Sequence, residues 1–399
     1  MVSILDTDLY KFTTSYAYMK LFPDAECTFT FVDRNKIPRT EKFLIELKEE
    51  LKNLERVQLT IPEFKWCVEH IPFIPEFYWE WLKTFRFDMS KCKVYLDDEK
   101  VLHMEVTDKC YRCTLYEIPF LFAIPEVTNR DKVVDLASTL LKLKEKIVLA
   151  NEANMLFSEF GTRRRFSFQV QKEVIEYLSQ FAKTCVGTSN VYFAMTYGMK
   201  PIGTHPHEWF MFHGAQYGYK NANYMALENW VNVYDGNLGI ALSDTYTSDV
   251  FFRNFSLKQA KLFDGVRQDS GDEYEFMEKT INFYKNKGID PTTKTIVFSN
   301  ALDFPKAVEI NKFCKGNIKA SFGIGTNITC DVYKPEGGYY GHENIVMKMS
   351  KCRMNKNQPW FNTIKISDDL GKHMGNSKEF EHACYELGIV EEKIQKKFI

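Results

Sequence analysis

Three of the eight histidines in this 399-residue chain lie within nine residues of one another. They are His205, His207 and His213, and the same stretch contains Thr204 and Glu208. A short apolar step precedes it, which predicts the end of a strand followed by a turn. Because imidazole can carry a proton, attack phosphorus or bind a metal at neutral pH, the role of this stretch largely decides the function.

The histidines allow three interpretations. His205 and His207 are two residues apart, the spacing of a metal pair on one strand of a barrel hydrolase, with His213 as a third ligand. Alternatively, His207 is a nucleophile or proton carrier with Glu208 beside it. In the third interpretation both imidazoles only satisfy loop amides. The histidines alone leave all three open.

Other polar residues follow short apolar runs in the second half of the chain. Asp244 follows one run, and Arg267 and Asp269 end another, two residues apart and therefore on one side of a strand. Arg267 is suited to a phosphate or carboxylate, and the two aspartates to Mg²⁺ or a ribose hydroxyl. An alternative is a structural ion pair. Residues 323–327 read Gly-Ile-Gly-Thr-Asn, a turn whose amides suit a phosphate.

The elements that position these residues alternate between short strands and helices from about residue 155 onward. This alternation predicts an α/β fold with parallel strands. The strands form either a doubly wound sheet or a barrel, and the active site lies at their carboxyl ends. A long helical pattern covers residues 131–157. Before it, helices and strands alternate irregularly, and the aromatic-rich stretch 62–87 predicts short helices.

Composition excludes several classes of protein. The net charge of −1 argues against a nucleic-acid binder. There is no signal-peptide pattern at the N-terminus and no run of 18 apolar residues, so we expect a cytoplasmic protein that does not enter a membrane. In the cytoplasm we expect the ten scattered cysteines to be reduced thiols, and this includes the isolated pair Cys110 and Cys113.

Six motifs in order resemble the nicotinate phosphoribosyltransferases, and the bacterial branch most closely. They cover most of the chain: residues 7–11 (TDLYK), 159–165 (EFGTRRR), 187–190 (GTSN), 203–204 with 207–210 (GT, HEWF), 266–272 (VRQDSGD) and 322–327 (FGIGTN).

The resemblance implies an irregular β/α barrel over residues 131–344 and an N-terminal α/β sandwich domain. That domain would comprise residues 1–130, completed by 345–399. It also implies a homodimer with its sites at the subunit interface. The implied enzyme is an ATP-dependent, ligase-type transferase of NAD salvage. It would join nicotinate to 5-phosphoribosyl 1-diphosphate (PRPP), with Mg²⁺, and form nicotinate mononucleotide and pyrophosphate through a phosphohistidine.

The resemblance also assigns roles to residues of this chain. His207 would be phosphorylated by ATP, Glu208 would orient it, and Asp269 would act in catalysis. Asp244 and Asp269 would hold Mg²⁺ directly or through water. The substrate contacts would be Tyr10, stacked on the pyridine ring from the partner subunit, together with Arg164, Ser189, Thr204, Arg267, Gly325 and Thr326.

The residue at position 189 distinguishes enzymes that use nicotinate from enzymes that use nicotinamide, and here it is Ser189. Similar enzymes that use nicotinamide have an aspartate at this position, which would repel nicotinate, whereas a hydroxyl can donate to it. The main alternatives are therefore a nicotinamide phosphoribosyltransferase, a metal-dependent barrel hydrolase that uses His205 and His207, and a silent phosphoribosyl-binding protein.

Overall fold

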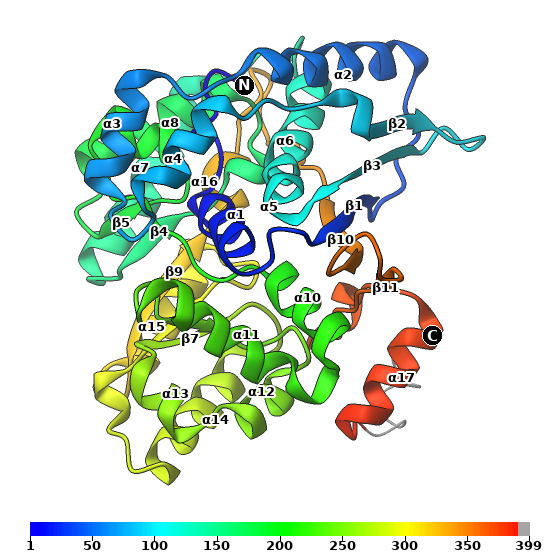
Figure 1. Cartoon of the computed structure of the whole chain (residues 1–399). Coiled ribbons are helices and arrows are strands. Elements are labelled where there is room, and N and C mark those ends of the chain that lie inside the picture. Colours follow the sequence, from blue (N-terminus) through cyan, green and yellow to red (C-terminus); the bar gives the residue numbers. More distant parts are fainter. Residues whose placement is uncertain (390–399) are drawn as a thin grey trace.

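The computed structural model describes residues 1–389 and contains two sheets (Figure 1). The first is antiparallel, with strand order β11-β10-β1-β3-β2. Its strands are β1 (Glu26–Asp33), β2 (Cys92–Leu96), β3 (Leu102–Lys109), β10 (Ile345–Arg353) and β11 (Phe361–Asn362). Strand β3 alternates buried and partly exposed residues along its whole length, the pattern of a strand with one face on the core.

The helices of this first region are α1 (Leu9–Leu21), α2 (Glu41–Asn53), α3 (Ile61–His70), α4 (Glu76–Thr84), α5 (Cys110–Cys113) and α6 (Glu117–Thr128). Helix α2 begins at the cap Thr40, whose hydroxyl accepts from the Phe43 amide. The aromatic-rich stretch forms α3 and α4, as predicted, and Tyr78 and Trp79 of α4 are fully buried. Helix α1 is almost entirely buried, so it lies inside the molecule.

The second sheet is parallel, with strand order β5-β4-β9-β8-β7-β6. Its strands are β4 (Phe157–Glu159), β5 (Cys185–Thr188), β6 (Ile240–Leu242), β7 (Gly265–Gln268), β8 (Thr295–Phe298) and β9 (Lys319–Ile324). The predicted α/β class with parallel strands is therefore confirmed. Within residues 1–389 no ladder joins β5 to β6, so a closed barrel stays a prediction.

The helices that connect these strands are α7 (Leu136–Glu152), α8 (Phe168–Phe181), α9 (Val191–Tyr197), α10 (His207–Tyr217), α11 (Tyr219–Tyr234), α12 (Ser248–Asn254), α13 (Leu257–Leu262), α14 (Glu273–Asn286), α15 (Phe304–Cys314) and α16 (Thr326–Thr329). Helix α7 is shorter than the pattern over 131–157 predicts. Asn154 has a positive φ of 49°, which ends the helix, and Phe157 then begins β4.

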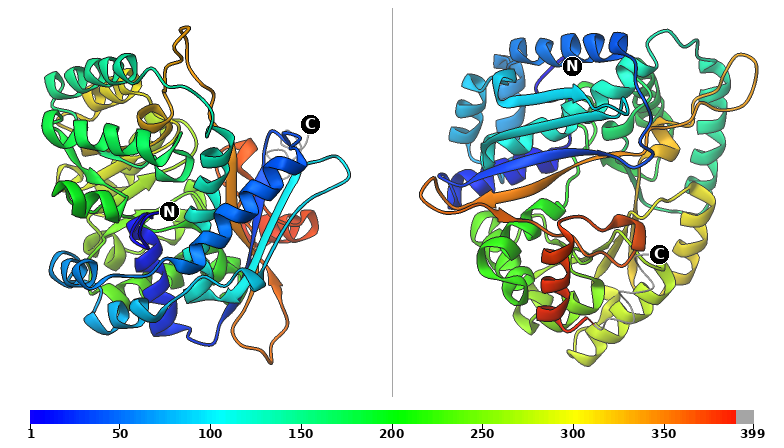
Figure 2. Two further views of the ribbon diagram at one scale, coloured as in Figure 1. Left: turned by 90° about the horizontal axis from the view of Figure 1, so that it is seen from above. Right: turned by 90° about the vertical axis from the view of Figure 1, so that its right-hand side faces the viewer.

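The chain returns to the first sheet near its C-terminus. Strand β10 pairs with β1 along its length, side by side in both views of Figure 2. After β11 the chain leaves that sheet. Ile366 donates its amide to Thr245, and helix α17 (Ser377–Leu387) packs on α11. Thr363 still donates to Ser350 of β10, and the chain contacts the parallel-sheet region from Ile366 onward. The expected completion of the N-terminal domain by residues 345–399 stays a prediction, and the last ten of those residues lie outside the described range.

No helix among residues 1–389 is both long and apolar enough to cross a membrane. The ten cysteines all lie within these residues, and each is a free thiol.

Candidate active site

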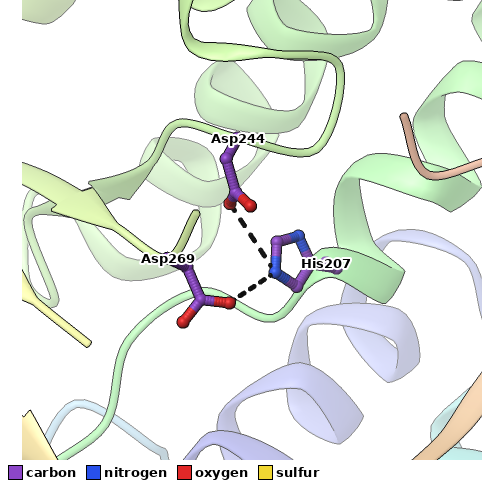
Figure 3. Close-up of side chains that lie close together, drawn as sticks. All are labelled: His207, Asp244 and Asp269. Atoms are coloured by element: carbon purple, nitrogen blue, oxygen red, sulfur yellow. Dashed lines mark hydrogen bonds and ion pairs between the residues drawn. The ribbon is translucent and has the colours of Figure 1, made fainter. Parts of the chain in front are cut away.

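His207 is the first residue of helix α10, at the end of a loop that follows α9 and touches β5 through a bridge between Pro201 and Thr188 (Figure 3). Its Nε2 atom lies 3.0 Å from Oδ2 of Asp269 and 3.6 Å from Oδ1 of Asp244. Its Nδ1 atom lies 3.0 Å from the Thr245 hydroxyl. Burial and the nearby ammonium of Lys365 lower the pKa of His207 to about 4, so the imidazole is neutral at pH 7.

The two aspartates come from the carboxyl ends of neighbouring strands, β6 and β7, as the sequence predicted. Burial opposes ionisation of Asp269, but Arg267 and His207 outweigh it and hold its pKa well below the usual range. Lys365 and His207 likewise lower the pKa of the buried Asp244. Both carboxylates are therefore ionised, and they face a neutral imidazole.

Lys365 is a member of this site that the sequence did not reveal. Its Nζ lies 3.0 Å from His207 Nε2 and 3.3 Å from Oδ2 of Asp244. An ammonium has only donors, so the lone pair of Nε2 can accept from Lys365 while Nδ1 donates to Thr245. Lys365 belongs to the C-terminal segment, 158 residues after His207. No spacing in the sequence pointed to it.

His205 has a different environment from His207. Its ring lies 4.4 Å from the Trp230 ring and 5.9 Å from the rings of Phe210 and Phe263, and it is fully buried. Among residues 1–389 neither ring nitrogen has a hydrogen-bond partner. Burial and the charge of Arg267 lower its pKa to about 3. The metal pair of His205 and His207 considered from the sequence is not formed, because His205 points into an aromatic pocket.

His213 is also no ligand to such a site. Its Nδ1 donates to the Trp209 carbonyl at 2.7 Å, and its Nε2 lies 2.9 Å from the Asn229 amide nitrogen. Nδ1 is therefore used within α10, and Nε2 joins α10 to α11.

Glu208 does not orient His207, contrary to the expectation. Its carboxylate accepts from Lys11 at 2.5 Å and from the Thr114 hydroxyl at 2.6 Å. Consecutive residues on a helix point about 100° apart, so neighbours in sequence do not face each other. Thr245 and Lys365 hold the imidazole instead.

Arg267 links three parts of the site. Its guanidinium donates to Asp269 at 2.8 Å, to the Thr204 hydroxyl at 2.7 Å and to the Ser299 hydroxyl at 2.8 Å. The Ser299 hydroxyl in turn donates to Asp269. The structure thus brings Thr204, Arg267 and Asp269 together, and it adds Ser299 to the predicted set.

Ser189 and Tyr10 lie in a second part of the site, where the N-terminal segment runs beside residues 188–192. The Ser189 hydroxyl donates to Asp8 at 2.7 Å, and the Leu9 amide donates to the Ser189 carbonyl. The Tyr10 amide lies close to Gly203 in the loop that leads to His207. Tyr10 thus reaches the loop of its own chain, so its distance along the sequence is no reason to assign it to a partner subunit.

Asp8 is a carboxylate that the sequence did not single out at this position. Burial raises its pKa, and the Ser189 hydrogen bond and the charge of Arg163 offset only part of that effect. The Ser189 hydroxyl therefore already has a carboxylate partner within this chain.

Gly325 and Thr326 lie against the arginine-rich loop. The Gly325 Cα faces the Phe160 carbonyl so closely that an added Cβ would lie 2.8 Å from its oxygen, which requires glycine there. Thr329 donates to the Gly161 carbonyl, and the Cys330 thiol to that of Arg164. The Arg164 carbonyl therefore lies beside Cys330, just after the glycine turn, while its side chain donates to the Ile345 carbonyl; its role in substrate binding stays a prediction.

Sequence and structure comparisons identify relatives over the whole chain. The profile of the Nicotinate phosphoribosyltransferase (NAPRTase) family matches residues 155–389, and that of its N-terminal domain matches residues 5–125. The nicotinate phosphoribosyltransferase of Methanosarcina mazei is 43% identical over 408 residues, which cover 97% of this chain and 98% of that protein. That of Chromohalobacter salexigens is 40% identical over 396 residues, again 97% and 98% of the two chains.

A crystal structure of the nicotinate phosphoribosyltransferase from Porphyromonas gingivalis superimposes with a TM-score of 0.95 at 46% identity, covering 98% of this chain and 100% of that one. The parallel sheet, its reactive strand ends and these matches define an enzyme of the phosphoribosyltransferase class. The chain belongs to the nicotinate phosphoribosyltransferase family. The resemblance drawn from six sequence motifs is confirmed.

Proposed function

We propose that this enzyme joins nicotinate to PRPP in NAD salvage, forming nicotinate mononucleotide and pyrophosphate, and that ATP drives the reaction by phosphorylating His207. Membership of the family supports the transfer. The ATP step rests on one observation above all. A buried, neutral imidazole points Nε2 toward two ionised carboxylates and one ammonium, at the start of a helix.

In the transfer step, positive charge develops on C1 of the ribosyl group as pyrophosphate leaves. Asp269 and Asp244 lie at one end of the site and stabilise that charge. Their charges act in a buried setting, where they are stronger than in water. Arg267 holds Asp269 in place and keeps donors available for a phosphate or for the nicotinate carboxylate.

The donor set fits a magnesium ion. Oδ1 of Asp244 is buried and has no hydrogen-bond partner among the described residues. One carboxylate oxygen of Asp244, one of Asp269 and one ring nitrogen of His207 lie within 4.8 Å of one another. Mg²⁺ in such enzymes takes one or two carboxylates and completes its shell with substrate phosphates and water. Asp244 and Asp269 would hold the ion, which would neutralise charge on the leaving diphosphate.

In the ATP step, Nε2 of His207 attacks the γ-phosphorus, a nitrogen–phosphorus bond forms and ADP leaves. The lone pair is available because the pKa of His207 is about 4. The Thr245 hydroxyl accepts a hydrogen bond from the Nδ1–H group and fixes the ring. Lys365 and the amino end of the eleven-residue helix α10 favour the negative charge of the phosphoryl group.

A cluster of cations supports binding of the anionic PRPP and nucleotide groups. Burial, followed by the charges of Arg163 and Arg34, lowers the pKa of Arg164 to about 9. Burial lowers the pKa of Lys348 to about 8, and the charge of Arg163 adds to the effect. Cations that repel one another in this way gain from a bound phosphate. Arg164 also borders a cavity of about 230 Å³ beside His342.

A homodimer is part of the proposal. Helix α7 exposes Leu141, Val148 and Leu149 on one face, and Phe181 at the end of α8 is half exposed. A cluster of exposed apolar side chains of this kind marks a protein–protein contact.

The free thiols support a reducing, cytoplasmic location.

A product assay tests the proposed function. Purified enzyme is given PRPP with nicotinate, nicotinamide or quinolinate, each with and without ATP, and products are resolved by chromatography. We expect nicotinate mononucleotide from nicotinate, faster with ATP, and ADP formed in proportion. Equal turnover of nicotinamide would support the amide alternative, and binding of PRPP without any product would support a silent binding protein.

A further inference from the structure

The chain from residue 365 to residue 374, here called the C-terminal loop, lies against the carboxyl ends of β6 and β7. It is closed on itself, because the Lys365 amide donates to the Met374 carbonyl at 3.1 Å and the Met374 amide donates to the Lys365 carbonyl at 3.0 Å. Ile366 donates its amide to the Thr245 carbonyl at 2.8 Å, just after β6. The loop is therefore an ordered element that is fixed beside the catalytic cluster.

Three groups of the C-terminal loop make hydrogen bonds to three successive residues of the turn after β7. In each bond the group named first donates: the Lys372 ammonium to the Asp269 carbonyl (2.6 Å), the Asp368 amide to the Ser270 hydroxyl (3.1 Å), and the Gly271 amide to the Asp369 carboxylate (2.9 Å). The turn that presents Asp269 is thus held residue by residue from the C-terminal loop.

Ser270 extends this set of contacts to the second carboxylate of the site. Its hydroxyl accepts from the Asp368 amide and donates to Oδ2 of Asp244 at 2.6 Å. The side chains of Asp244 and Asp269 both point toward Nε2 of His207 (Figure 3). The C-terminal loop therefore contacts the backbone of one carboxylate residue directly and the side chain of the other through one hydroxyl.

The Lys372 ammonium is fully engaged within the protein. Its three N–H groups match three oxygens, the Asp269 carbonyl and Oδ1 of Asn300, each at 2.6 Å, and Oδ2 of Asp369 at 3.1 Å. Asn300 follows β8, so Lys372 ties the carboxyl ends of β7 and β8 to the C-terminal loop. An ammonium with its donors engaged in this way orients protein groups and does not itself bind a phosphate.

We propose that Lys372 is a positioning residue: together with Asp368 and Asp369 it fixes Asp244 and Asp269 relative to each other, and so sets the affinity for the divalent cation. This inference rests on the proposed function, because it takes these two carboxylates as the ligands of the ion. Groups that orient the ligands of a metal change its affinity by about 10- to 100-fold when they are removed.

The sign of the effect distinguishes positioning from a simple effect of charge. Lys372 is a cation, so its charge repels a divalent ion, and its removal by that effect alone would strengthen binding of the ion. If Lys372 holds the carboxylates in place, its removal weakens binding instead. The two interpretations thus predict opposite changes in one dissociation constant.

The test is a titration of the full-length enzyme with Mn²⁺, which like Mg²⁺ prefers carboxylate and water ligands. The electron paramagnetic resonance signal of the free ion gives the Kd. The variants are Lys372→Met, Lys372→Arg, Ser270→Ala, Asp244→Asn and Lys378→Met. Lys378→Met is the matched control, because Lys378 is an exposed lysine further along the same C-terminal region, on α17. Thermal melts check the folding of each variant.

We expect Lys372→Met to raise the Kd for Mn²⁺ by about 10- to 100-fold. Ser270→Ala changes no charge and should raise it in the same direction. Lys372→Arg should keep most of the affinity, since a guanidinium also donates to carbonyl and carboxylate oxygens. Lys378→Met should bind as the wild type does. The Mg²⁺ concentration that half-saturates nicotinate mononucleotide formation should rise in parallel with the Kd, while the nicotinate KM at saturating Mg²⁺ stays unchanged.

Three outcomes overturn the inference. An unchanged or lower Kd in Lys372→Met would reduce Lys372 to a structural contact, whatever its melting temperature. An equal loss of affinity in Lys378→Met would show a general effect of charge in this region. If Mn²⁺ binds Asp244→Asn as tightly as it binds the wild type, the metal site of the proposed function fails first, and this is visible before Lys372 is compared. Should Lys372→Met not fold, Ser270→Ala decides the question, with the same expected loss.

Discussion

Two regions of one loop hold two imidazoles in opposite settings. His207 lies in a polar region with Thr245, Asp269, Asp244 and Lys365 around it. His205, two residues earlier, lies in an aromatic pocket against Trp230, and no hydrogen bond to it is recorded in the part of the chain that the structure describes.

Both imidazoles are buried, and both have a lowered pKa, about 4 for His207 and about 3 for His205. A shifted pKa therefore does not distinguish a chemical residue from a packed one. The arrangement of charged partners does, since only His207 has carboxylates and an ammonium around one nitrogen.

The largest expected effect is a loss of kcat, caused by a change in the polar region around His207. Asp269→Asn should lower kcat by about 10²- to 10³-fold, because the charge matters most as pyrophosphate leaves, and should leave the nicotinate KM nearly unchanged. Steady-state kinetics with nicotinate and PRPP check this. Asp272→Asn is the control, since Asp272 only caps α14. A similar loss in both variants would remove Asp269 from the chemistry.

A smaller effect, on the rate at which ATP labels His207, is expected for Lys365→Met. It removes the ammonium that contacts both His207 and Asp244. ATP-dependent labelling of His207 should slow by about 10- to 100-fold, the kinetic equivalent of one charged hydrogen bond. Lys279→Met removes an ammonium that contacts Asp249 and the Ser248 hydroxyl but not His207, and it should label at the wild-type rate. Unchanged labelling in Lys365→Met would limit Lys365 to a structural role.

In the aromatic pocket the expected effect is on stability alone. His205→Leu removes a buried polar ring without partners and should raise the free energy of unfolding by about 1 kcal/mol, with kcat unchanged. His213→Leu is the contrasting variant, because both nitrogens of His213 are hydrogen-bonded, and it should destabilise. Urea unfolding measures both. A large loss of kcat in His205→Leu would contradict the claim that His205 is only a packed residue.

The last expected effect is on the pH dependence of stability. The pKa of His205 is about 3 in the folded protein, below the ordinary 6.5, so below pH 6.5 the unfolded chain binds a proton that the folded chain does not. Stability is then lost as pH falls from about 6.5 toward 3, by about 1.4 kcal/mol per pH unit for this group. His205→Leu should unfold with a shallower slope between pH 7 and pH 5. An unchanged slope would contradict the assignment.

The sequence predicted the parts of this molecule that depend on local pattern. Asp244, Arg267 and Asp269 were found because each ends a short apolar strand, and parallel strands bring such ends together. His207 was found from its motif. Its separation from His205 was not predictable, because it depends on the pocket that Trp230 forms from another helix.

The residues that the sequence missed or misplaced depend on long-range topology. Lys365 reaches His207 from the C-terminal segment, 158 residues further along the chain. Glu208 was assigned to His207 from adjacency in sequence, whereas helical geometry turns it toward Lys11.

Labelling with [γ-³²P]ATP tests the central claim most directly. Wild-type enzyme and His207→Ala are incubated with labelled ATP, and the protein-bound label is tested for lability in acid. We expect acid-labile label on the wild type and none on His207→Ala, which should still form some nicotinate mononucleotide from PRPP without consuming ATP. Acid-labile label that persists on His207→Ala would contradict the account.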